Sequence, residues 1–500
     1  MRYFLLVSAS VLTVIISALP LARTFGQVQN PTEAKAPNED AKACGGGALD
    51  PDVGIEACSR LLDQEVRDSA QRRAIALTFR GMAWKAKGDL KKAVADLTEA
   101  IGLDEGFVPA YETRADLLRD NDQCDLALPE YDRVIKLARD RPSAYISRAL
   151  CLSTKDQLQG AGEDLDRAIK LDANNAGGYA MTALGIKARL DIARNEVDDA
   201  LKSYDAAIAL DPKLPALYLD RGAVLSAKGD QDMALMDYDR ATKLDESNVG
   251  GFAVAARILK GRLEASRGNF DAAVGEYEQA IKLDPKRISL YLDRARLWNL
   301  KGDTDRALTD YSEAIKVDPT NALAFNSRGD LYRNQGDYQH AIADYDQAVE
   351  KQPNDLTAFG NRALVRFYQG EFVKAADDLK RVVDAAPNAY PALLLYVTKS
   401  RDGDARDAKS DLTKISAKLK AGDWPYPIVE FYLGKQSLRV TEGVAKTPEQ
   451  RCETQFYIGE WHLLRKDRSE AAKALQAAAD TCPKNFVEYR GALEELKRLK

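Results

Sequence analysis

Small and bulky apolar residues follow a fixed schedule along most of the chain. Nine units each contain one small residue, and a Leu, Tyr or Phe lies four positions before it. An alanine follows the small residue after twelve or seventeen positions, with a Leu or Tyr four positions further on. These spacings place the apolar residues on one face of a helix, so each unit is predicted to hold two helices. The small residues are Gly81, Ala115, Ala149, Ala183, Gly222, Ala256, Ala295, Gly329 and Ala363.

Proline and glycine divide the units from one another. Pro285, Pro319, Pro353 and Pro387 stand 34 residues apart, and a fixed period of this size indicates stacked repeats. A proline has no amide hydrogen to donate, so each of these residues is expected to stop the second helix of its unit. Gly-Asp pairs such as Gly336-Asp337 are predicted to end the first helix and to cap the second.

The pattern resembles the tetratricopeptide repeat, most clearly in AFNSRGDLYRNQGDYQHAIADYDQAVEKQP, from Ala324 to Pro353. The resemblance implies an all-α fold, in which a right-handed superhelical solenoid of helix-turn-helix repeats spans residues 51–387 and an α-helical cap follows. In seven units an arginine precedes the small residue, where the family usually has leucine. We interpret these arginines as side chains whose stems lie in the groove between repeats while their charges reach solvent. They are Arg80, Arg114, Arg148, Arg221, Arg294, Arg328 and Arg362.

Two units are 39 residues long rather than 34. The distance from the small residue to the turn is longer in the segments Ala183 to Asn195 and Ala256 to Gly268. We therefore expect the first helix of each to be lengthened by five residues, or roughly 7 Å, and to protrude on one rim. The extension is either a tolerated insertion or a contact for a partner.

After Pro387 the repeat pattern fades and then returns. Residues 388–450 are predicted to be a degenerate helical segment, with a helix pair around Asp402-Gly403, a break at Trp424 to Pro427 and a helix from Ile428 to Val440. Residues 451–500 are predicted to form a terminal repeat-like unit and a polar capping helix, as the end of a solenoid requires.

The N-terminus has the composition of an export signal. A nearly uncharged apolar run extends from Tyr3 to Ala22, longer than most signal-peptide cores and near the lower limit for a membrane span. Residues 1–26 are therefore predicted to be a signal peptide cleaved before Gln27, or alternatively a retained N-terminal membrane anchor. Residues 27–50 are expected to be a flexible leader.

Six cysteines in an exported chain suggest disulfides, which form in oxidising compartments. In the repeat frame, Cys452 begins the first helix of the last unit and Cys482 ends its second, so the two are predicted to pair. Cys44 is predicted to pair with Cys58. The pair Cys124 and Cys151 is either a third disulfide or two buried free thiols.

The sequence contains few candidate catalytic residues. The chain has only two histidines, His340 and His462, and it lacks clustered metal ligands, phosphate-binding glycine loops and nucleophile motifs. We therefore expect no enzyme activity, no metal and no cofactor. The net charge of −5 comes from 72 basic and 77 acidic residues, without a long basic block, so no nucleic-acid partner is expected.

In the tetratricopeptide family, the concave wall is formed by residues three before and one after the small position. Here these positions include an apolar stretch followed by basic residues, a combination that suits an extended or helical partner segment with apolar anchors and an acidic end. The alternative is that these residues only pack within the array. The predicted partner-binding residues are Ile146, Leu150, Leu184, Leu219, Arg257, Leu292, Arg296 and Asn326.

Together these features predict an exported, non-catalytic adaptor or assembly scaffold of the bacterial periplasm that binds a protein or peptide partner in its groove. One alternative is a scaffold anchored to the inner membrane. Another is an envelope enzyme or glycan-binding protein, which would require four aromatic residues of the C-terminal cap to converge on an open pocket. These residues are Trp424, Tyr426, Trp461 and Tyr489.

Overall fold

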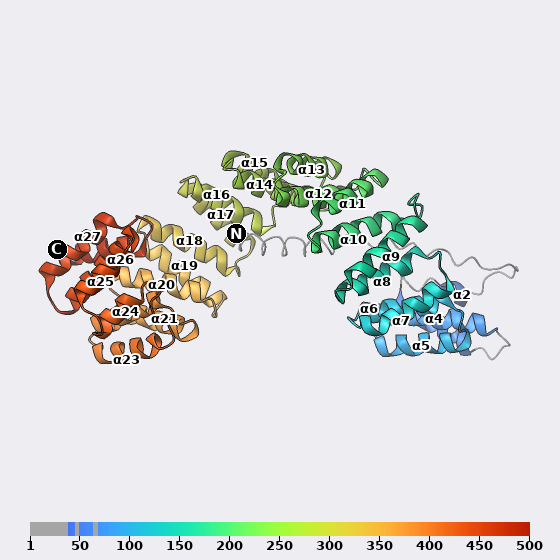
Figure 1. Ribbon diagram of the computed structural model, residues 1–500, viewed down its shortest axis with the longest axis horizontal. Helices are drawn as coiled ribbons and strands as arrows, with labels where there is room; N and C mark the ends of the chain where they lie inside the picture. Colours follow the sequence, from blue (N-terminus) through green and yellow to red (C-terminus); the bar gives the residue numbers. More distant parts are fainter. Residues whose placement is uncertain (1–38, 46–49, 64–68) are drawn as a thin grey trace. The chain divides into compact units, whose positions relative to one another are not determined.

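The computed structural model describes residues 39–45, 50–63 and 69–500, which contain 27 α-helices and no strand (Figure 1). The predicted signal segment 1–26 lies outside these residues. The chain divides into two compact units, residues 1–259 and 260–500, and the division falls within α14 (Phe252–Ser266).

The helices of the first unit run in antiparallel pairs along the chain. They are α2 (Glu39–Gly45), α3 (Pro51–Asp63), α4 (Ala70–Ala86), α5 (Leu90–Leu103), α6 (Val108–Arg119), α7 (Cys124–Leu137), α8 (Pro142–Thr154), α9 (Leu158–Leu171), α10 (Tyr179–Ala193), α11 (Val197–Leu210), α12 (Pro215–Lys228) and α13 (Gln231–Leu244).

The second unit continues this arrangement and ends in a helical cap. Its helices are α15 (Phe270–Leu283), α16 (Ile288–Leu300), α17 (Thr304–Val317), α18 (Ala322–Gln335), α19 (Tyr338–Lys351), α20 (Leu356–Gln369), α21 (Phe372–Ala385), α22 (Ala389–Arg401), α23 (Ala405–Ser416), α24 (Tyr426–Leu433), α25 (Leu438–Val444), α26 (Pro448–Leu464), α27 (Arg468–Thr481) and α28 (Val487–Leu499).

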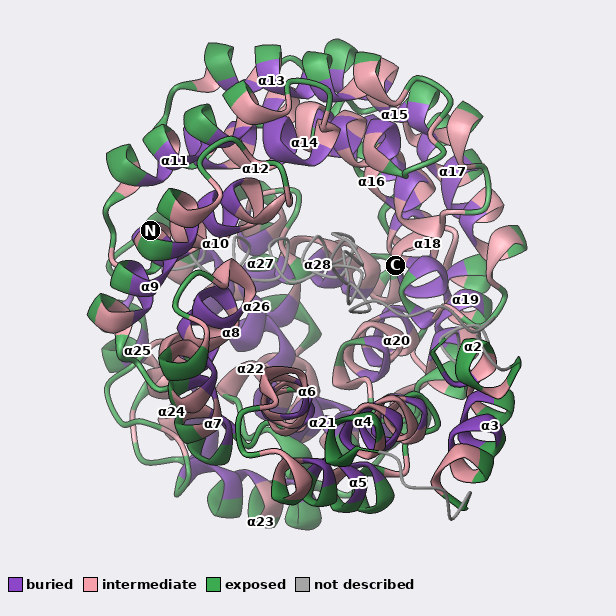
Figure 2. Cartoon of the chain, turned by 90° about the vertical axis from the view of Figure 1, so that its right-hand side faces the viewer, coloured by how far each residue is buried: buried purple, intermediate pink, exposed green. Residues whose placement is uncertain are grey.

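The predicted repeats correspond to the nine helix pairs from α4/α5 to α20/α21, which confirms the all-α repeat fold. The helices α15, α17, α19 and α21 each end two residues before a proline of the 34-residue series. Gly336 has the positive φ of a helix C-cap, and the Asp337 side chain accepts a hydrogen bond from the backbone amide of His340. Figure 2 shows buried and exposed residues on different sides of the helices, as in α13.

The leader is predicted to be flexible over residues 27–50, whereas residues 39–45 form α2. The physical reason is a double attachment to α3. Cys44 is buried and bonded to Cys58, and the Arg60 guanidinium bonds the Asp40 carboxylate at 2.7 Å. A covalent link and an ion pair therefore hold this part of the leader against the first unit.

Glycine at the small position lets the two helices of a repeat approach closely. A methyl group added at Gly329 would lie 2.9 Å from the Tyr345 ring, and Tyr345 is fully buried. The equivalent contact at Gly222 is with Tyr238, at 2.8 Å. These tyrosines lie 16 residues after the small residue, so this spacing marks which residue faces the second helix.

The same spacing shows that the predicted five-residue helix extensions are wrong. In the two long repeats the residues 16 positions before Tyr204 and Tyr277 are Ala188 and Gly261, five positions after the predicted small residues. A methyl group at Gly261 would meet Tyr277 at 3.0 Å, and Ala188 is fully buried. The helices α10 and α14 have only 15 residues each, and most of the added length is in the seven-residue loops 172–178 and 245–251 before them.

These two loops cap the helices that follow them. Asp172 accepts hydrogen bonds from the amides of Gly177 and Tyr179, at 3.1 and 2.7 Å, and Asn175 accepts one from Met181 at 3.0 Å. Such bonds satisfy the free amides of a helix N-terminus. The second loop repeats every contact, with Asp245 bound by Gly250 and Phe252, and Asn248 bound by Val254.

The arginine before the small residue forms a buried ion pair with the second helix of its own repeat, 16 residues later. In six repeats the pair is bidentate, with nitrogen–oxygen distances of 2.6 to 2.9 Å, and the aspartate is buried. The pairs are Arg80–Asp96, Arg148–Asp164, Arg221–Asp237, Arg294–Asp310, Arg328–Asp344 and Arg362–Asp378.

Several of these arginines also reach the preceding repeat. Arg221 Nη1 bonds the Asp205 carboxylate at 2.6 Å, and Asp205 lies 16 residues earlier, on α11. Arg148 and Arg362 make the same contact with Asp132 and Asp346. The interpretation of these arginines as side chains whose charges reach solvent is therefore wrong, because each guanidinium bridges helices. Hydrogen bonding to Asp237 is the main cause that raises the pKa of Arg221.

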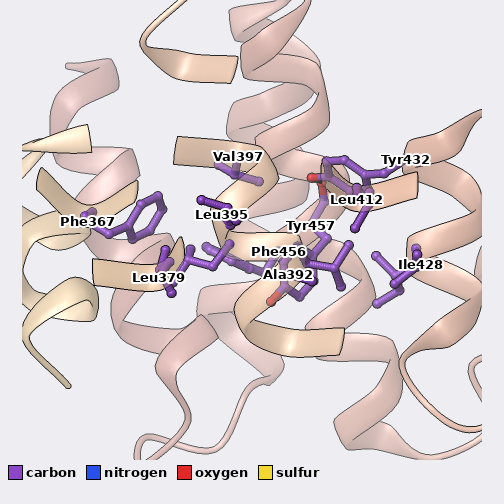
Figure 3. Close-up of a cluster of buried hydrophobic side chains, with 14 of the residues drawn as sticks. Phe367, Leu379, Ala392, Leu395, Val397, Leu412, Ile428, Tyr432, Phe456 and Tyr457 are labelled. Atoms are coloured by element: carbon purple, nitrogen blue, oxygen red, sulfur yellow. Dashed lines mark hydrogen bonds between the residues drawn. The ribbon is translucent and has the colours of Figure 1, made fainter. Parts of the chain in front are cut away.

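The C-terminal region joins the last repeats in one apolar core. Phe367, Leu379, Leu395, Ile428 and Phe456 bring α20, α21, α22, α24 and α26 together (Figure 3). The helix expected from Ile428 to Val440 instead ends at Leu433, where Gly434 adopts a positive φ, and α25 starts at Leu438.

All three predicted cysteine pairs are bonded in the structure. They are Cys44–Cys58, Cys124–Cys151 and Cys452–Cys482, with Cα–Cα distances of 4.8, 5.2 and 5.0 Å.

Replacing Gly329 by alanine should destabilise the fold by about 1–3 kcal/mol, because the added methyl group overlaps the Tyr345 ring. The control is Gly275→Ala in α15, where an added methyl group meets no atom within 4 Å. That change should stabilise the protein by up to about 1 kcal/mol through helix propensity. Urea unfolding followed by circular dichroism measures both, and equal midpoints for the two variants would refute the close-packing argument.

Asp237→Asn should lower the free energy of unfolding by about 3 kcal/mol, because it leaves Arg221 without its buried partner. Asp205→Asn removes a partner of the same guanidinium, but the Asp205 side chain is 61% exposed, so its loss should cost less than about 1 kcal/mol. Thermal melts of the two variants provide the comparison. An equal loss of stability in both would show that burial does not set the strength of the bridge.

Candidate ligand-binding cavity

The residues predicted to bind a partner are mostly packed between repeats. Ile146, Leu184, Leu219, Leu292 and Asn326 are buried, Leu150 and Arg257 are half-buried, and Arg296 is exposed. Ile146 and Leu184 belong to separate apolar clusters. The structure therefore does not gather these eight residues into one site within either unit, and their role in binding stays a prediction.

The register of the two long repeats explains in part why the predicted partner-binding residues do not form one site. Since Ala188 and Gly261 face the second helices, the position after the small residue is occupied by Arg189 and Arg262 rather than by Leu184 and Arg257. Arg189 lies 3.5 Å from the Asp220 carboxylate, and Arg262 lies 3.1 Å from that of Asp293. Both arginines thus tie their repeat to the next one.

In the second unit, the last helix packs back onto helices of earlier repeats, chiefly the first helix α20. α28 contacts α20 as well as α26 and α27. The Tyr338 hydroxyl donates to Glu494 at 2.9 Å, and the Arg498 guanidinium donates to the Phe367 carbonyl at 2.8 Å. We call the surface formed by the first helices of the repeats the inner face, and α28 covers part of it.

A cavity of about 470 Å³ lies beside α28 on this inner face. Gly360 and Leu364, which line it from α20, occupy the two positions that the resemblance to the tetratricopeptide repeat assigns to the concave wall. The lining residues are Thr357, Gly360, Asn361, Leu364, Phe367, Tyr368, Leu379, Tyr390, Pro391, Leu394, Glu453, Phe456, Tyr457, Phe486, Val487 and Glu488.

Two buried carboxyl groups are part of this wall. Glu453 on α26 accepts hydrogen bonds from the Tyr390 hydroxyl at 2.9 Å and from the Trp424 indole at 2.5 Å, both at Oε2. Glu488, in the first turn of α28, is 3% exposed, and its Oε1 has no hydrogen-bond partner in the part of the chain that the structure describes. Burial raises the pKa of Glu488 to about 7, and the nearby charge of Glu453 also raises it.

A second pair of buried carboxyl groups close by has its own cation. Glu460 and Glu495 are almost fully buried, and Arg401 lies 3.1 Å from each of them. Arg498 also pairs with Glu495. Burial, followed by the charge of Glu495, raises the pKa of Glu460 to about 8. Through Arg401, this pair connects α22, α26 and α28. By contrast, the cavity has no Lys, Arg or His among the described residues that line it.

The four aromatic residues of the cap that an enzyme or glycan site would require do not converge on the cavity. None of them lines it. Trp424 reaches it only through its bond to Glu453, and Trp461 packs against Phe431 with ring centroids 5.2 Å apart.

The two histidines lie apart from the cavity. His340 Nδ1 is 2.7 Å from Asp337 at the start of α19, and His462 is 3.5 Å from Asp467. Within residues 39–45, 50–63 and 69–500, no group of three or more His, Cys, Asp or Glu side chains could hold a metal ion.

Sequence reasoning missed both carboxyl groups of the cavity and the partners of the repeated arginines. The arginine partners carry a signal, since an acidic residue follows each arginine after 16 positions. Glu453 and Glu488 carry none, because they belong to different helices outside the regular repeats, where no period relates them.

Several solved structures are similar to this chain. A tetratricopeptide repeat protein from Parabacteroides merdae is 20% identical, with a TM-score of 0.35 over 51% of this chain and 98% of that chain. Yeast Tom70 is 16% identical, with a TM-score of 0.33 over 83% of this chain and 98% of that chain. YrrB, described as a TPR protein with an unusual peptide-binding site, is 23% identical, with a TM-score of 0.31 over 40% of this chain and 97% of that chain.

Family patterns match the repeats themselves. Residues 113–176, 258–322, 301–355 and 326–390 match the family described as tetratricopeptide repeat, and residues 188–229 match the one described as TPR repeat. The matched segments coincide with helix pairs that have the close-packed small residues and caps described above. Residues 113–176, 188–229 and 258–390 are therefore tetratricopeptide repeats.

Proposed function

We propose that this protein is a non-catalytic adaptor that binds a peptide segment or helix of a partner protein on the inner face of its repeats. Tetratricopeptide repeats mediate binding between proteins and to peptides. The proposal is supported most directly by the inner-face cavity, because it offers a concave, largely apolar surface with a few polar groups, as ligand sites commonly do.

The packing of α28 supports a helical or extended partner. This amphipathic helix lies on α20 and is held by hydrogen bonds from Arg490 and Arg498 to backbone carbonyls of Asn334 and Phe367. A helix laid in a groove is a common mode of peptide recognition. The inner face thus already accommodates one helix, and the uncovered part of it is available to another.

The groove residues predicted from the sequence divide into two roles in this proposal. Ile146, Leu184, Leu219, Leu292 and Asn326, being buried, hold the first helices in place. Leu150, Arg257 and Arg296 keep exposed surface, but none of them lines the cavity, so their contact with a partner stays a prediction from the sequence.

The proposed location is the bacterial periplasm. Three disulfides suit an oxidising compartment, and residues 1–26 have the composition of an export signal. None of the helices in the described ranges is long and apolar enough to cross a bilayer. A retained N-terminal anchor that faces the periplasm is the alternative.

A peptide-display screen against residues 27–500 tests the binding proposal. Peptides selected on the wild-type protein should bind about tenfold or more weakly to Leu364→Asp, because the charge enters the apolar wall of the cavity. Val373→Asp on α21 is the matched control, since Val373 is 54% exposed and lies outside the cavity.

A second variant, Thr357→Trp, covers the case in which Leu364→Asp fails to fold. Thr357 is an exposed lining residue, so a bulky side chain there should block the cavity without disturbing the core. Fluorescence anisotropy measures affinity for each variant after circular dichroism has verified its fold. Unchanged affinity in both inner-face variants would refute this site.

The proposed location predicts that the protein purified from its own envelope fraction begins at Gln27 and contains no free thiol. N-terminal sequencing and thiol titration under denaturing, non-reducing conditions measure the two properties. A reduced Cys452 would argue against the oxidising compartment, and a mature chain that starts at Met1 would favour the anchored alternative.

A further inference from the structure

We propose that the inner-face cavity binds a protonated amine carried on an apolar body, with the ammonium group paired to Glu488 and Glu453. The inference rests on the inner-face site of the proposed function and adds the chemical class of its ligand. The amine has two possible sources: a free small molecule, or a lysine side chain of the partner peptide.

The first argument is the uncompensated acidity of the cavity. Two buried carboxyl groups face the same space, and none of the described lining residues carries a positive charge. Glu488 Oε1 is buried without a donor. A buried acceptor without a hydrogen bond is costly, and a buried carboxylate without a cation more so. An ammonium group supplies both the missing donor and the missing charge.

The second argument is the contrast with the neighbouring carboxyl pair. Glu460 and Glu495 are buried in the same cap, and there the fold provides Arg401 as a shared cation, at 3.1 Å from each. Arg498 adds a second. The fold thus sets two arginines beside Glu460 and Glu495, whereas none of the described residues that line the cavity of Glu453 and Glu488 is a cation.

The third argument is the chemistry of the walls. Phe367, Tyr368, Phe456, Tyr457 and Phe486 surround the cavity with aromatic rings, which attract cations through their faces and pack against apolar stems. A volume of about 470 Å³ is in the range of small-molecule sites. A ligand with one charged end and an apolar body therefore matches both parts of the wall.

These walls favour an organic cation over a metal ion. Calcium takes six to eight oxygen ligands, whereas the two carboxyl groups are the only acidic side chains among the described lining residues. One of them, Glu453, already accepts two hydrogen bonds at Oε2. A quaternary ammonium group is also disfavoured, because it has no N–H group to donate to Glu488 Oε1.

Isothermal titration calorimetry with residues 27–500 tests this inference. The probes are phenethylamine, phenethyl alcohol as its neutral analogue, the peptide acetyl-Leu-Lys-Leu-amide and calcium chloride. At about pH 8.5, phenethylamine or the lysine peptide should bind about tenfold or more tightly than the alcohol. Binding by phenethylamine alone identifies a free amine as the ligand, and binding by the peptide alone identifies a partner lysine.

Glu488→Gln keeps the shape of the side chain and removes its charge. It should weaken amine binding about tenfold or more and leave the affinity for the alcohol unchanged. The matched control is Glu313→Gln on α17, a residue that pairs with Lys316 at the surface. This control should bind the amine like the wild type.

Amine affinity should also rise between about pH 6 and about pH 8.5, because Glu488 is protonated below its raised pKa and ionised above it. The titratable groups that face Glu488 are Glu453 and Tyr457 on α26, Tyr390 on α22 and Tyr368 on α20. The tyrosine pKa values are raised by burial, so these groups stay neutral in this range. Glu453→Gln should reduce amine affinity without removing the pH dependence.

Three outcomes would overturn the inference: no binding of either amine probe, equal affinity for phenethylamine and phenethyl alcohol, or amine binding that Glu488→Gln leaves unchanged. Calcium binding that displaces the amine probes and requires Glu488 would also overturn it, in favour of a metal site. Any of these results can occur while displayed peptides still bind the inner face, so a failure of the amine inference is distinguishable from a failure of the adaptor proposal.

Discussion

The bidentate ion pair between an arginine of the first helix and an aspartate of the second is the constraint on which the rest of the structure depends. The buried aspartate requires a cation, and only one helix register places the guanidinium in reach. Where the same guanidinium also contacts Asp132, Asp205 or Asp346 of the preceding repeat, one side chain sets both the geometry within a repeat and the stacking between repeats. We interpret these pairs as fixing the orientation of the helices in addition to stabilising them.

The C-terminal cap uses the same chemistry for a different purpose. Arg401 joins Glu460 on α26 to Glu495 on α28, and this contact holds the last helix against the array. Because α28 is fixed there, its first turn presents Glu488 to the space beside α20. The cavity therefore depends on the ending of the solenoid: a regular further repeat would have continued the stack instead of folding back over the inner face.

Periodic features of the fold could be predicted from the sequence, because the same residue types recur at the same positions of each unit. The helix pairs, the proline stops and the cap at Asp337 all follow from residues that recur at one spacing. The prediction of helix extensions was wrong because two small residues, five positions apart, fit the pattern in each long repeat. Only the contact with Tyr204 or Tyr277 distinguishes Ala188 and Gly261 from Ala183 and Ala256. Glu453 and Glu488 could not be predicted, since their proximity comes from the tertiary return of α28.

The two capping loops, which begin at Asp172 and Asp245, lie 73 residues apart and make the same hydrogen bonds. The ion pairs Arg189–Asp220 and Arg262–Asp293 are also 73 residues apart in the sequence. We infer that a long repeat and the regular repeat after it were copied together, since these contacts recur in that larger block. Such a block carries its own cap and its own bridges, so it is the natural increment by which an array of this kind lengthens or shortens during evolution.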